Sequence, residues 1–335
     1  MSDNVTAARR PLPAAPPRVV RLVGTLGPLL GLFAVYALFA IIGPDTFTSL
    51  RNLETMARQT AIVSGVALGM TLLIVSGGID LSVGSIVALA SVIVALVLNA
   101  GMGPWVACLA AVAAGSLCGV ASGLIITRLR VTPFIVTLGM LLLVRGVAKG
   151  LANEQKVNAP VTWLGDLLAT LPPGSRWQLL PVGVWFVIAL ALVTSGILHY
   201  TRLGRHLQAI GSNEATARLC GVPVNLRKIQ IYTLSSALAG ASGVLQFSRL
   251  TVGDPTVATG LELDVIAAVV IGGGSLSGGE GSVIGTLVGA LIMTVIRSGS
   301  SQMGLPNWIQ EIVTGIIIVF AVALDRWRHR RLSEA

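Results

Sequence analysis

Few residues in this 335-residue sequence could take part in a chemical reaction. The three histidines and three cysteines do not have the spacing of metal ligands or of a disulfide framework. The sequence also lacks a phosphate-binding loop, an HExxH motif, a dinucleotide fingerprint and a Ser-His-Asp set. It therefore predicts a protein without an active site and without a metal or organic cofactor of its own.

Asp80 is the one acidic residue placed deep in the apolar first half of the chain. An ionisable group inside a membrane is a candidate for a transport role or a proton relay. Asp80 also precedes a predicted helix, where a carboxylate can accept hydrogen bonds from free backbone N–H groups. We favour this capping role, because the equivalent residue in an internal repeat is Ser275, which can also cap a helix.

The internal repeat consists of two glycine-rich segments. GGIDLSVGSIVALA (Gly77–Ala90) matches GGGSLSGGEGSVIGTLVGA (Gly272–Ala290) after a two-residue insertion. Six predicted helices lie between the copies, which would make them parallel, whereas one span more or fewer would make them inverted. Duplicated, glycine-interrupted segments are typical of transporters. We expect a hinge or a pathway for a neutral, hydroxyl-rich solute, although close helix packing fits equally well. The residues concerned are Gly77, Gly78, Asp80, Ser82, Gly272, Gly273, Gly274, Ser275 and Ser277.

The composition indicates where these segments lie. The chain is 54% hydrophobic and 11% charged, whereas a soluble domain carries about 25% charged residues. Apolar runs of about 18 residues or more recur along most of it. The predicted fold class is therefore all-α, a polytopic membrane protein surrounded by lipid. Ten spans are predicted, at residues 22–42, 59–76, 82–99, 104–126, 134–152, 181–199, 229–248, 262–277, 282–298 and 309–324.

The basic residues orient these spans. If the N-terminus is inside, the inner segments are 1–21, 127–133, 200–228 and 325–335, and they hold 15 of the 23 Lys and Arg residues. This asymmetry follows the positive-inside rule. We expect a membrane domain at 22–324 between two cytoplasmic tails, of which 1–21 is disordered. The net charge of +9 is then explained by orientation and not by nucleic-acid binding.

Two features of the predicted outer side have alternative explanations. Arg145 falls in the outer third of its span, where it could snorkel to the headgroups or line a translocation path. The outer segment 153–180 carries Trp163 and Trp177. These tryptophans could anchor the protein at the headgroups, or the segment could be a landing surface for an extracytoplasmic protein.

The longest polar segment between two spans is the inner loop 200–228. Ser212 and Asn213 suit a helix N-cap, and Glu214 suits the positive end of a helix dipole. Gly221 can end that helix in the left-handed conformation. A short helix over Glu214–Cys220 is therefore predicted. From these residues alone it could be a solvated connector or a docking helix for a soluble partner.

Five stretches of the chain carry a family resemblance. They are GGIDLSVGS (Gly77–Ser85), TPFIVTLGMLLLVRG (Thr132–Gly146), GRHLQAIGSNEATARLCGV (Gly204–Val222), LSSALAGASGVLQFSRL (Leu234–Leu250) and GLELDVIAAVVIGGGSLSGGEGSVIGTLVGAL (Gly260–Leu291). Through them the chain resembles permease subunits of ATP-binding-cassette (ABC) importers for monosaccharides, of the ribose, xylose and arabinose type. It is also similar to permeases for autoinducer-2 and nucleosides, and more distantly to those for branched-chain amino acids and urea.

The resemblance implies a type II importer fold in the bacterial inner membrane, working as a dimer, most simply a homodimer. The implied partners are a cytoplasmic ATPase, which binds ATP and Mg, and an extracytoplasmic sugar-binding protein. The family's coupling segment corresponds to Gly211–Val222, which favours the docking helix over the connector. The expected coupling residues are Gly211, Ser212, Asn213, Glu214, Ala215, Ala217 and Gly221.

Two rival functions remain open at this point. A secondary carrier or channel needs no ATPase, but such proteins often hold ion-coupling acids near the membrane midplane, and only Asp80 is available here. A membrane-embedded enzyme is disfavoured by the missing catalytic residues. The identity of the solute is not specified by any residue of the sequence.

Overall fold

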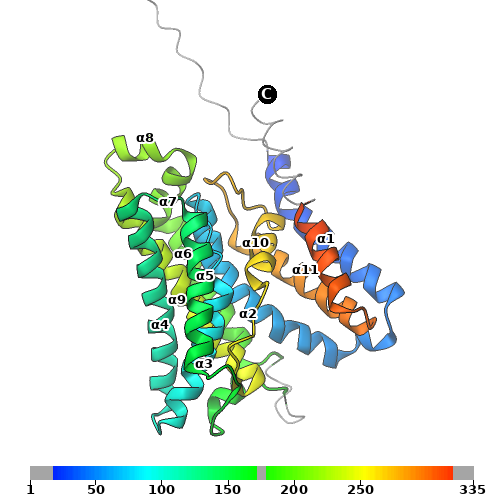
Figure 1. The fold of residues 1–335 in the computed structure, drawn as a ribbon. Helices are drawn as coiled ribbons and strands as arrows, with labels where there is room; N and C mark the ends of the chain where they lie inside the picture. The colour runs from blue at the N-terminus through cyan, green and yellow to red at the C-terminus, as the bar shows by residue number, and fades with distance from the viewer. Residues whose placement is uncertain (1–17, 172–178, 320–335) are drawn as a thin grey trace, which may run out of the picture.

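A computed structural model describes residues 18–171 and 179–319 of the protein, with side chains from residue 27 onward. Most of this part is helical, with only two short strands among the described residues (Figure 1). The elements are α1 (Arg18–Ile42), η1 (Asp45–Thr48), α2 (Leu50–Val75), α3 (Val83–Asn99), α4 (Pro104–Leu129), α5 (Pro133–Leu151), β1 (Val157–Asn158), η2 (Trp163–Leu168), α6 (Val182–Tyr200), α7 (Arg202–Ser212), α8 (Glu214–Leu219), α9 (Val224–Leu250), β2 (Val252–Gly253), α10 (Leu261–Ile271), α11 (Val283–Gln302) and a last helix, Asn307–Val319.

The predicted all-α fold of a polytopic membrane protein is confirmed. A helix lies at each predicted span, and α2, α4, α5, α6 and α11 are long and apolar enough to cross a membrane by length and composition. Parts of the predicted tails, the end of the tenth span and residues 172–178 fall outside the described residues. The first helix already begins at Arg18, within the segment predicted as a disordered tail.

Several helices differ in length from their predicted spans, among them α2 and α10. α2 begins at Leu50, nine residues before the predicted start of its apolar run, because the Ser49 side chain caps a polar first turn by accepting from the Asn52 N–H group. α10 has 11 residues, or roughly 16 Å at ~1.5 Å per residue, about half of a bilayer core. The predicted span at 262–277 extends about six residues beyond α10, because Gly273 takes a left-handed φ of 91° and ends the helix.

The long helix α9 lies at the centre of the fold and packs against α2, α3 and α4. Its contact with α4 is close because three glycines of α4, four residues apart, face it. A Cβ atom on Gly115, Gly119 or Gly123 would overlap main-chain atoms of α9. Small residues at this spacing let membrane helices pack through their backbones. On the other side of the molecule, α1 and α10 pack against α11 (Figure 1).

The two ends of the molecule carry different features. We call the end with the α7–α8 corner the α8 end, and the opposite end, reached by the C-terminus of α9, the sheet end (Figure 1). At the sheet end, β1 and β2 pair antiparallel, with Val157 opposite Gly253. The linkers after α2 and α10 lie together at the α8 end, where the Gly279 N–H group donates to the Val75 carbonyl, 2.9 Å. The two repeat copies are therefore parallel.

Candidate functional site

The α7–α8 corner is built by local capping chemistry. Asn213 has an extended backbone, so α7 ends and α8 begins at this residue, and its side-chain oxygen accepts from the Thr216 N–H group, 2.9 Å. Ser212 does not cap α8: it is the last residue of α7, and its hydroxyl donates to the Gln208 carbonyl. Gly221 is left-handed, with a φ of 82°. α8 ends at Leu219, one residue before the predicted end.

One face of α8 packs on the protein, and the opposite face is bare. Ala217 is 4% exposed and packs against Ile210 and Val224. Ala215 is exposed, and Leu219, four residues later on the same face, is 89% exposed. Leu219 was not among the predicted coupling residues. Its spacing from Ala215 was the signal available in the sequence.

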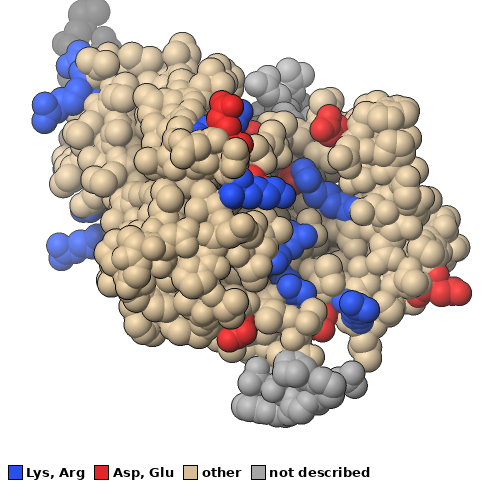
Figure 2. All heavy atoms as spheres, turned by 60° about the horizontal axis from the view of Figure 1, so that its bottom comes forward, with Lys and Arg blue, Asp and Glu red and all other residues tan. Residues whose placement is uncertain are grey.

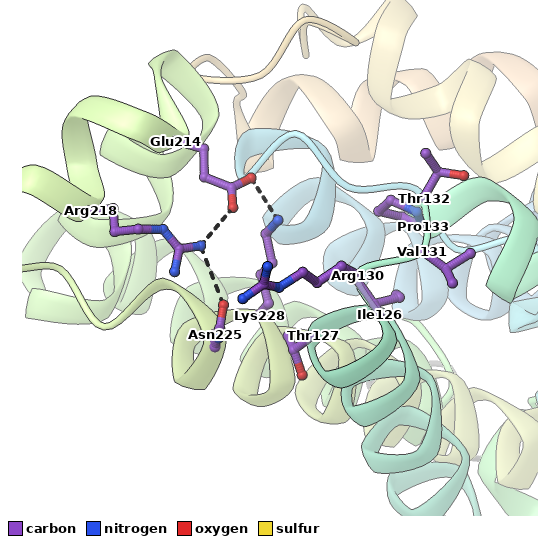
Figure 3. A pocket seen from close by; sticks show the side chains of 10 residues that line it. All are labelled: Ile126, Thr127, Arg130, Val131, Thr132, Pro133, Glu214, Arg218, Asn225 and Lys228. Carbon is purple, nitrogen blue, oxygen red and sulfur yellow. Dashed lines mark hydrogen bonds and ion pairs between the residues drawn. The ribbon is translucent and has the colours of Figure 1, made fainter.

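Glu214 braces α8 against α9. Its carboxylate forms an ion pair with Lys228 of α9, 2.7 Å, and a longer one with Arg218, 3.2 Å (Figure 3). Partial burial alone would raise the pKa of Glu214, but the hydrogen bonds and charges of Lys228 and Arg218 outweigh it and hold this pKa below its usual value. These residues border a polar cavity of about 570 Å³ between α8, α9 and the α4–α5 turn.

Beneath this corner, Gly211 brings the two repeat copies together. A Cβ atom on Gly211 would overlap the Val75 carbonyl oxygen, at the end of α2, and the Gly279 nitrogen, in the linker after α10. Gly278, which is left-handed with a φ of 87°, packs against the backbone of Gly211 as well. The predicted coupling segment and the predicted hinge segments are therefore in direct backbone contact.

The two copies also share the same helix ending. The Gly78 N–H group donates to the Leu73 carbonyl, and the Gly274 N–H group donates to the Val269 carbonyl, at 2.9 and 2.8 Å. This bonding, with left-handed glycines at Gly77 and Gly273, is the Schellman type of helix ending. Glycine is required at both left-handed positions for that reason.

A second shared turn follows in each copy. The Asp80 carboxylate accepts from the Ser82 N–H and hydroxyl groups, at 2.8 and 2.6 Å. The Ser275 hydroxyl accepts from the Ser277 N–H group, 3.2 Å. The prediction that Asp80 caps a helix was wrong in detail, because the N-cap of α3 is Ser82 and the Asp80 carboxylate holds the turn before it. The shared pattern still favours a structural role for both residues.

Burial separates the hinge and pathway interpretations of these residues. Asp80, Ser82 and Ser275 are each at most 1% exposed, so they do not line an open path in this conformation. Gly272 packs against the backbone of Gly285 in α11, as close helix packing requires. Gly77, Gly273 and Ser277 are the exposed members of the set.

Arg145 lies at the other end of the molecule and acts as a clamp. One terminal nitrogen of its guanidinium donates to the carbonyl oxygens of Pro255 and Val257, at 3.0 and 2.7 Å. Neither predicted role, snorkelling or lining a path, describes this geometry. The clamp ties α5 to the loop that follows β2.

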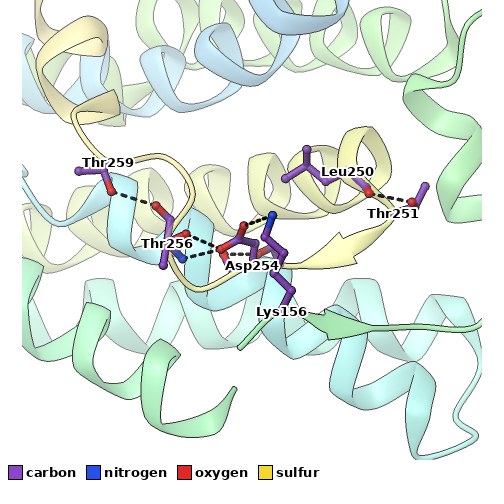
Figure 4. A network of polar contacts seen from close by, with 7 residues as sticks. Lys156, Leu250, Thr251, Asp254, Thr256 and Thr259 are labelled. Carbon is purple, nitrogen blue, oxygen red and sulfur yellow. Dashed lines mark hydrogen bonds and ion pairs between the residues drawn. The ribbon is translucent and has the colours of Figure 1, made fainter. Parts of the chain in front are cut away.

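The same loop is fixed from a second side by Asp254 (Figure 4). Its carboxylate accepts from the Thr256 N–H and hydroxyl groups, at 2.8 and 2.6 Å, and pairs with Lys156 at 3.4 Å. Burial opposes ionisation, but these partners prevail and lower the pKa of Asp254. Nearby in sequence, Trp163 packs against Trp105 with ring centroids 4.9 Å apart. The sheet end is therefore an ordered surface over these residues.

The chain matches one protein family over most of its length. The family is described as the permease component of a branched-chain amino acid transport system, and the match covers residues 52–322. The prediction of a transport permease is thereby confirmed. No solved structure matches the chain.

Individual relatives are similar over almost their whole length. The ribose import permease protein RbsC of Escherichia coli (strain K12) is 41% identical over 297 residues, which cover 89% of this chain and 92% of the relative. RbsC of Bacillus subtilis (strain 168) is 38% identical over 302 residues, or 90% and 92% of the two chains. The L-arabinose ABC transporter permease protein AraH of Azospirillum brasilense is 32% identical over 313 residues, or 93% and 91%.

Proposed function

This chain belongs to the family of permease components of branched-chain amino acid transport systems, and we propose that it is the membrane subunit of an ABC importer for a monosaccharide. It would carry a pentose or hexose across the bacterial inner membrane without hydrolysing ATP itself. The ribose and arabinose permeases among its relatives support this substrate class. ATP and Mg would be bound by a separate ATPase subunit.

The α7–α8 corner is the observation that carries the proposal. Its outer face, with Ala215 and Leu219, has no internal packing role, and this bare face suits a soluble partner. Its inner face connects to α9 through the Glu214–Lys228 ion pair and to both repeat copies through Gly211. A push on α8 by the ATPase would reach the linkers after α2 and α10 together.

The basic residues of loop 200–228 support an orientation with the α8 end in the cytoplasm and the sheet end outside. Under this orientation, the surface held by Arg145 and by the Lys156–Asp254 pair faces the extracytoplasmic sugar-binding protein. A fixed loop suits such a landing surface, because less ordering entropy is lost when the partner binds. Movement of the linkers that follow the glycine endings of α2 and α10 would switch the protein between outward-open and inward-open arrangements.

A second permease copy completes the proposed assembly. Large apolar side chains of α4, α5 and α6 are exposed, among them Leu109, Leu142 and Leu192. In the membrane these faces would contact lipid or the second copy. A homodimer is the simplest arrangement.

Two experiments test this proposal. Cells that lack the gene should lose uptake of a labelled monosaccharide while keeping uptake of leucine, and the full-length gene should restore it. Ribose, arabinose and xylose are the first sugars to test, and loss of leucine uptake alone would contradict the substrate class.

The orientation is tested with Cys220, which is exposed beside α8. A membrane-impermeant maleimide should label it from the cytoplasmic side only, and an added cysteine at Asp166, in a Cys220→Ser background, from outside only.

A further inference from the structure

The polar cavity beside α8 is lined by more basic than acidic side chains. It measures about 570 Å³, within the ~300–1,000 Å³ range of ligand pockets. Arg130, Arg218 and Lys228 line it, and Glu214 is the one acidic residue in its wall. Figure 2 looks onto the opposite, sheet end, where Lys and Arg side chains lie beside Asp and Glu side chains. The cavity beside α8 differs from that face by its excess of positive charge.

The acidic residue of this cavity is already paired, whereas basic groups remain unused. Oε1 of Glu214 pairs with Arg218 and Oε2 pairs with Lys228. A guanidinium group carries five N–H donors, and only the Nη2 atom of Arg218 is bonded, to Glu214 and Asn225. Arg130 has no hydrogen bond or ion pair with a described residue, and its side chain points from the α4–α5 turn toward Lys228 (Figure 3). The cavity therefore offers free cationic donors and suits an anion.

Arg130 occupies a backbone position that usually belongs to glycine. It is the C-cap of α4 and is left-handed, with a φ of 53°, a conformation in which a Cβ atom is unfavourable. In the same turn, Thr132 is the N-cap of α5 and makes no side-chain hydrogen bond to that helix. Thr132 lines the cavity, so the N-terminus of α5, which favours negative charge, borders it as well.

The surroundings of this turn indicate a lipid as the source of the anion. Residues 130–133 all line the cavity, and the apolar residues on either side of them, Leu129 and Phe134, are 68% and 54% exposed. α4 has 26 residues, or roughly 39 Å at ~1.5 Å per residue, so it is long enough to cross the ~30 Å hydrocarbon core and reach the headgroups. A phospholipid would place its phosphate in the cavity and its acyl chains against these apolar side chains. An acidic side chain of a soluble partner would match the charge alone.

We propose that the cavity beside α8 binds the phosphate group of an anionic phospholipid, such as phosphatidylglycerol, from the leaflet at the α8 end. The phosphate accepts hydrogen bonds from Arg130 and from the free N–H groups of Arg218. Basic side chains near a membrane surface attract anionic lipids in this way. The bound lipid would tie the α4–α5 turn to α8. This site goes beyond the proposed function, because it depends neither on the transported solute nor on an ATPase.

Native mass spectrometry of the full-length permease in detergent tests the site. The probes are phosphatidylglycerol and phosphatidylcholine with the same acyl chains, and inorganic phosphate is added as a competitor. Arg130→Gln removes the unpaired charge. Arg205→Gln is the matched control, because Arg205 on α7 is also exposed and has no hydrogen bond or ion pair with a described residue, yet it does not line the cavity.

Arg130→Gln should weaken phosphatidylglycerol binding about fivefold, and Arg205→Gln should leave it unchanged. This factor corresponds to the ~1 kcal/mol that one basic residue contributes near an anionic membrane surface, at ~1.4 kcal/mol per factor of ten. Arg130→Gly controls for folding, since glycine suits the left-handed backbone. Its unfolding temperature in phosphatidylcholine nanodiscs should not fall below that of the wild type, whereas phosphatidylglycerol should stabilise it less than the wild type.

The outcomes separate the lipid from other anions. A preference for phosphatidylglycerol that weakens in both Arg130 variants and not in Arg205→Gln supports the site. Equal binding of the two lipids, no lipid binding, or an equal loss in Arg130→Gln and Arg205→Gln overturns it. Displacement of the lipid by inorganic phosphate would assign the cavity to a free anion instead. Weaker binding of the purified ATPase to Arg130→Gln, with unchanged lipid binding, would assign it to an acidic side chain of that partner and also overturn the proposal.

Discussion

Leu219 allows a direct test of whether α8 docks on an ATPase. The side chain is 89% exposed and is the large apolar group on the bare face of α8. Replacing it with serine removes no internal packing, so the permease alone should unfold at the same temperature as the wild type. A solvated connector would tolerate this change without further effect.

A docking helix would not tolerate it. Burying a leucine side chain in an interface contributes about 1.5–3 kcal/mol. A loss of roughly 2 kcal/mol corresponds to about 30-fold weaker binding, at ~1.4 kcal/mol per factor of ten. Leu219→Ser should therefore weaken the permease–ATPase complex by about this factor, whereas Leu219→Met should keep most of the affinity.

The assay is binding of the purified ATPase subunit to the permease in nanodiscs, followed by biolayer interferometry. Thermal unfolding of each permease variant alone serves as the control for folding. Wild-type affinity for Leu219→Ser, together with wild-type affinity for Ala215→Trp on the same face, would refute the reasoning. The docking surface would then lie outside α8.

Three further predictions follow from the contacts at the two ends. Gly211→Ala should abolish stimulation of the ATPase by sugar-loaded binding protein, because the Cβ atom of the new alanine would overlap the main chain of Val75 and Gly279. The control Gly196→Ala should be neutral, because Gly196 has open space around it. Glu214→Gln should speed amide hydrogen exchange of α8 about threefold at pH 7, since partly exposed ion pairs contribute about 0.2–1 kcal/mol. The folded-state pKa of Glu214 is lowered, so the difference in exchange rate between Glu214→Gln and the wild type should be full above an unfolded pKa of about 4.3. It should shrink as the pH falls through the folded pKa and vanish below it. A difference in exchange rate that persists at the lowest pH would contradict the ion-pair explanation. Arg145→Gln should make the loop after β2 exchange faster by removing two charged hydrogen bonds, an effect that Lys149→Gln on the same helix should not reproduce.

Local chemistry made part of this structure predictable from the sequence. Apolar runs fix helices in a membrane, because backbone groups there must bond within the segment. Asn213 and Gly221 define a short helix through their own side-chain and backbone preferences, and these marked α8 to within one residue. The end of α10 was predicted too late, because the predicted span at 262–277 included the glycines that end the helix.

Contacts between distant residues could not be predicted in this way. The partner of Glu214 is Lys228, fourteen residues away, and their meeting depends on how α8 folds back onto α9. The partners of Arg145 are backbone carbonyls, which have no sequence signature. The direction of Ala217 is set by its packing on Ile210 and Val224, so its burial became visible only in the folded corner.

The central claim is that this chain imports a sugar only when a partner hydrolyses ATP. The most direct test is uptake of a labelled monosaccharide into proteoliposomes that contain the permease, the ATPase subunit and the sugar-binding protein, with ATP and Mg on the ATPase side. The account predicts uptake with the active ATPase and none with an ATPase variant that binds ATP without hydrolysing it. Uptake that continues with the inactive variant, or without any ATPase, would show a passive carrier or channel and contradict the account.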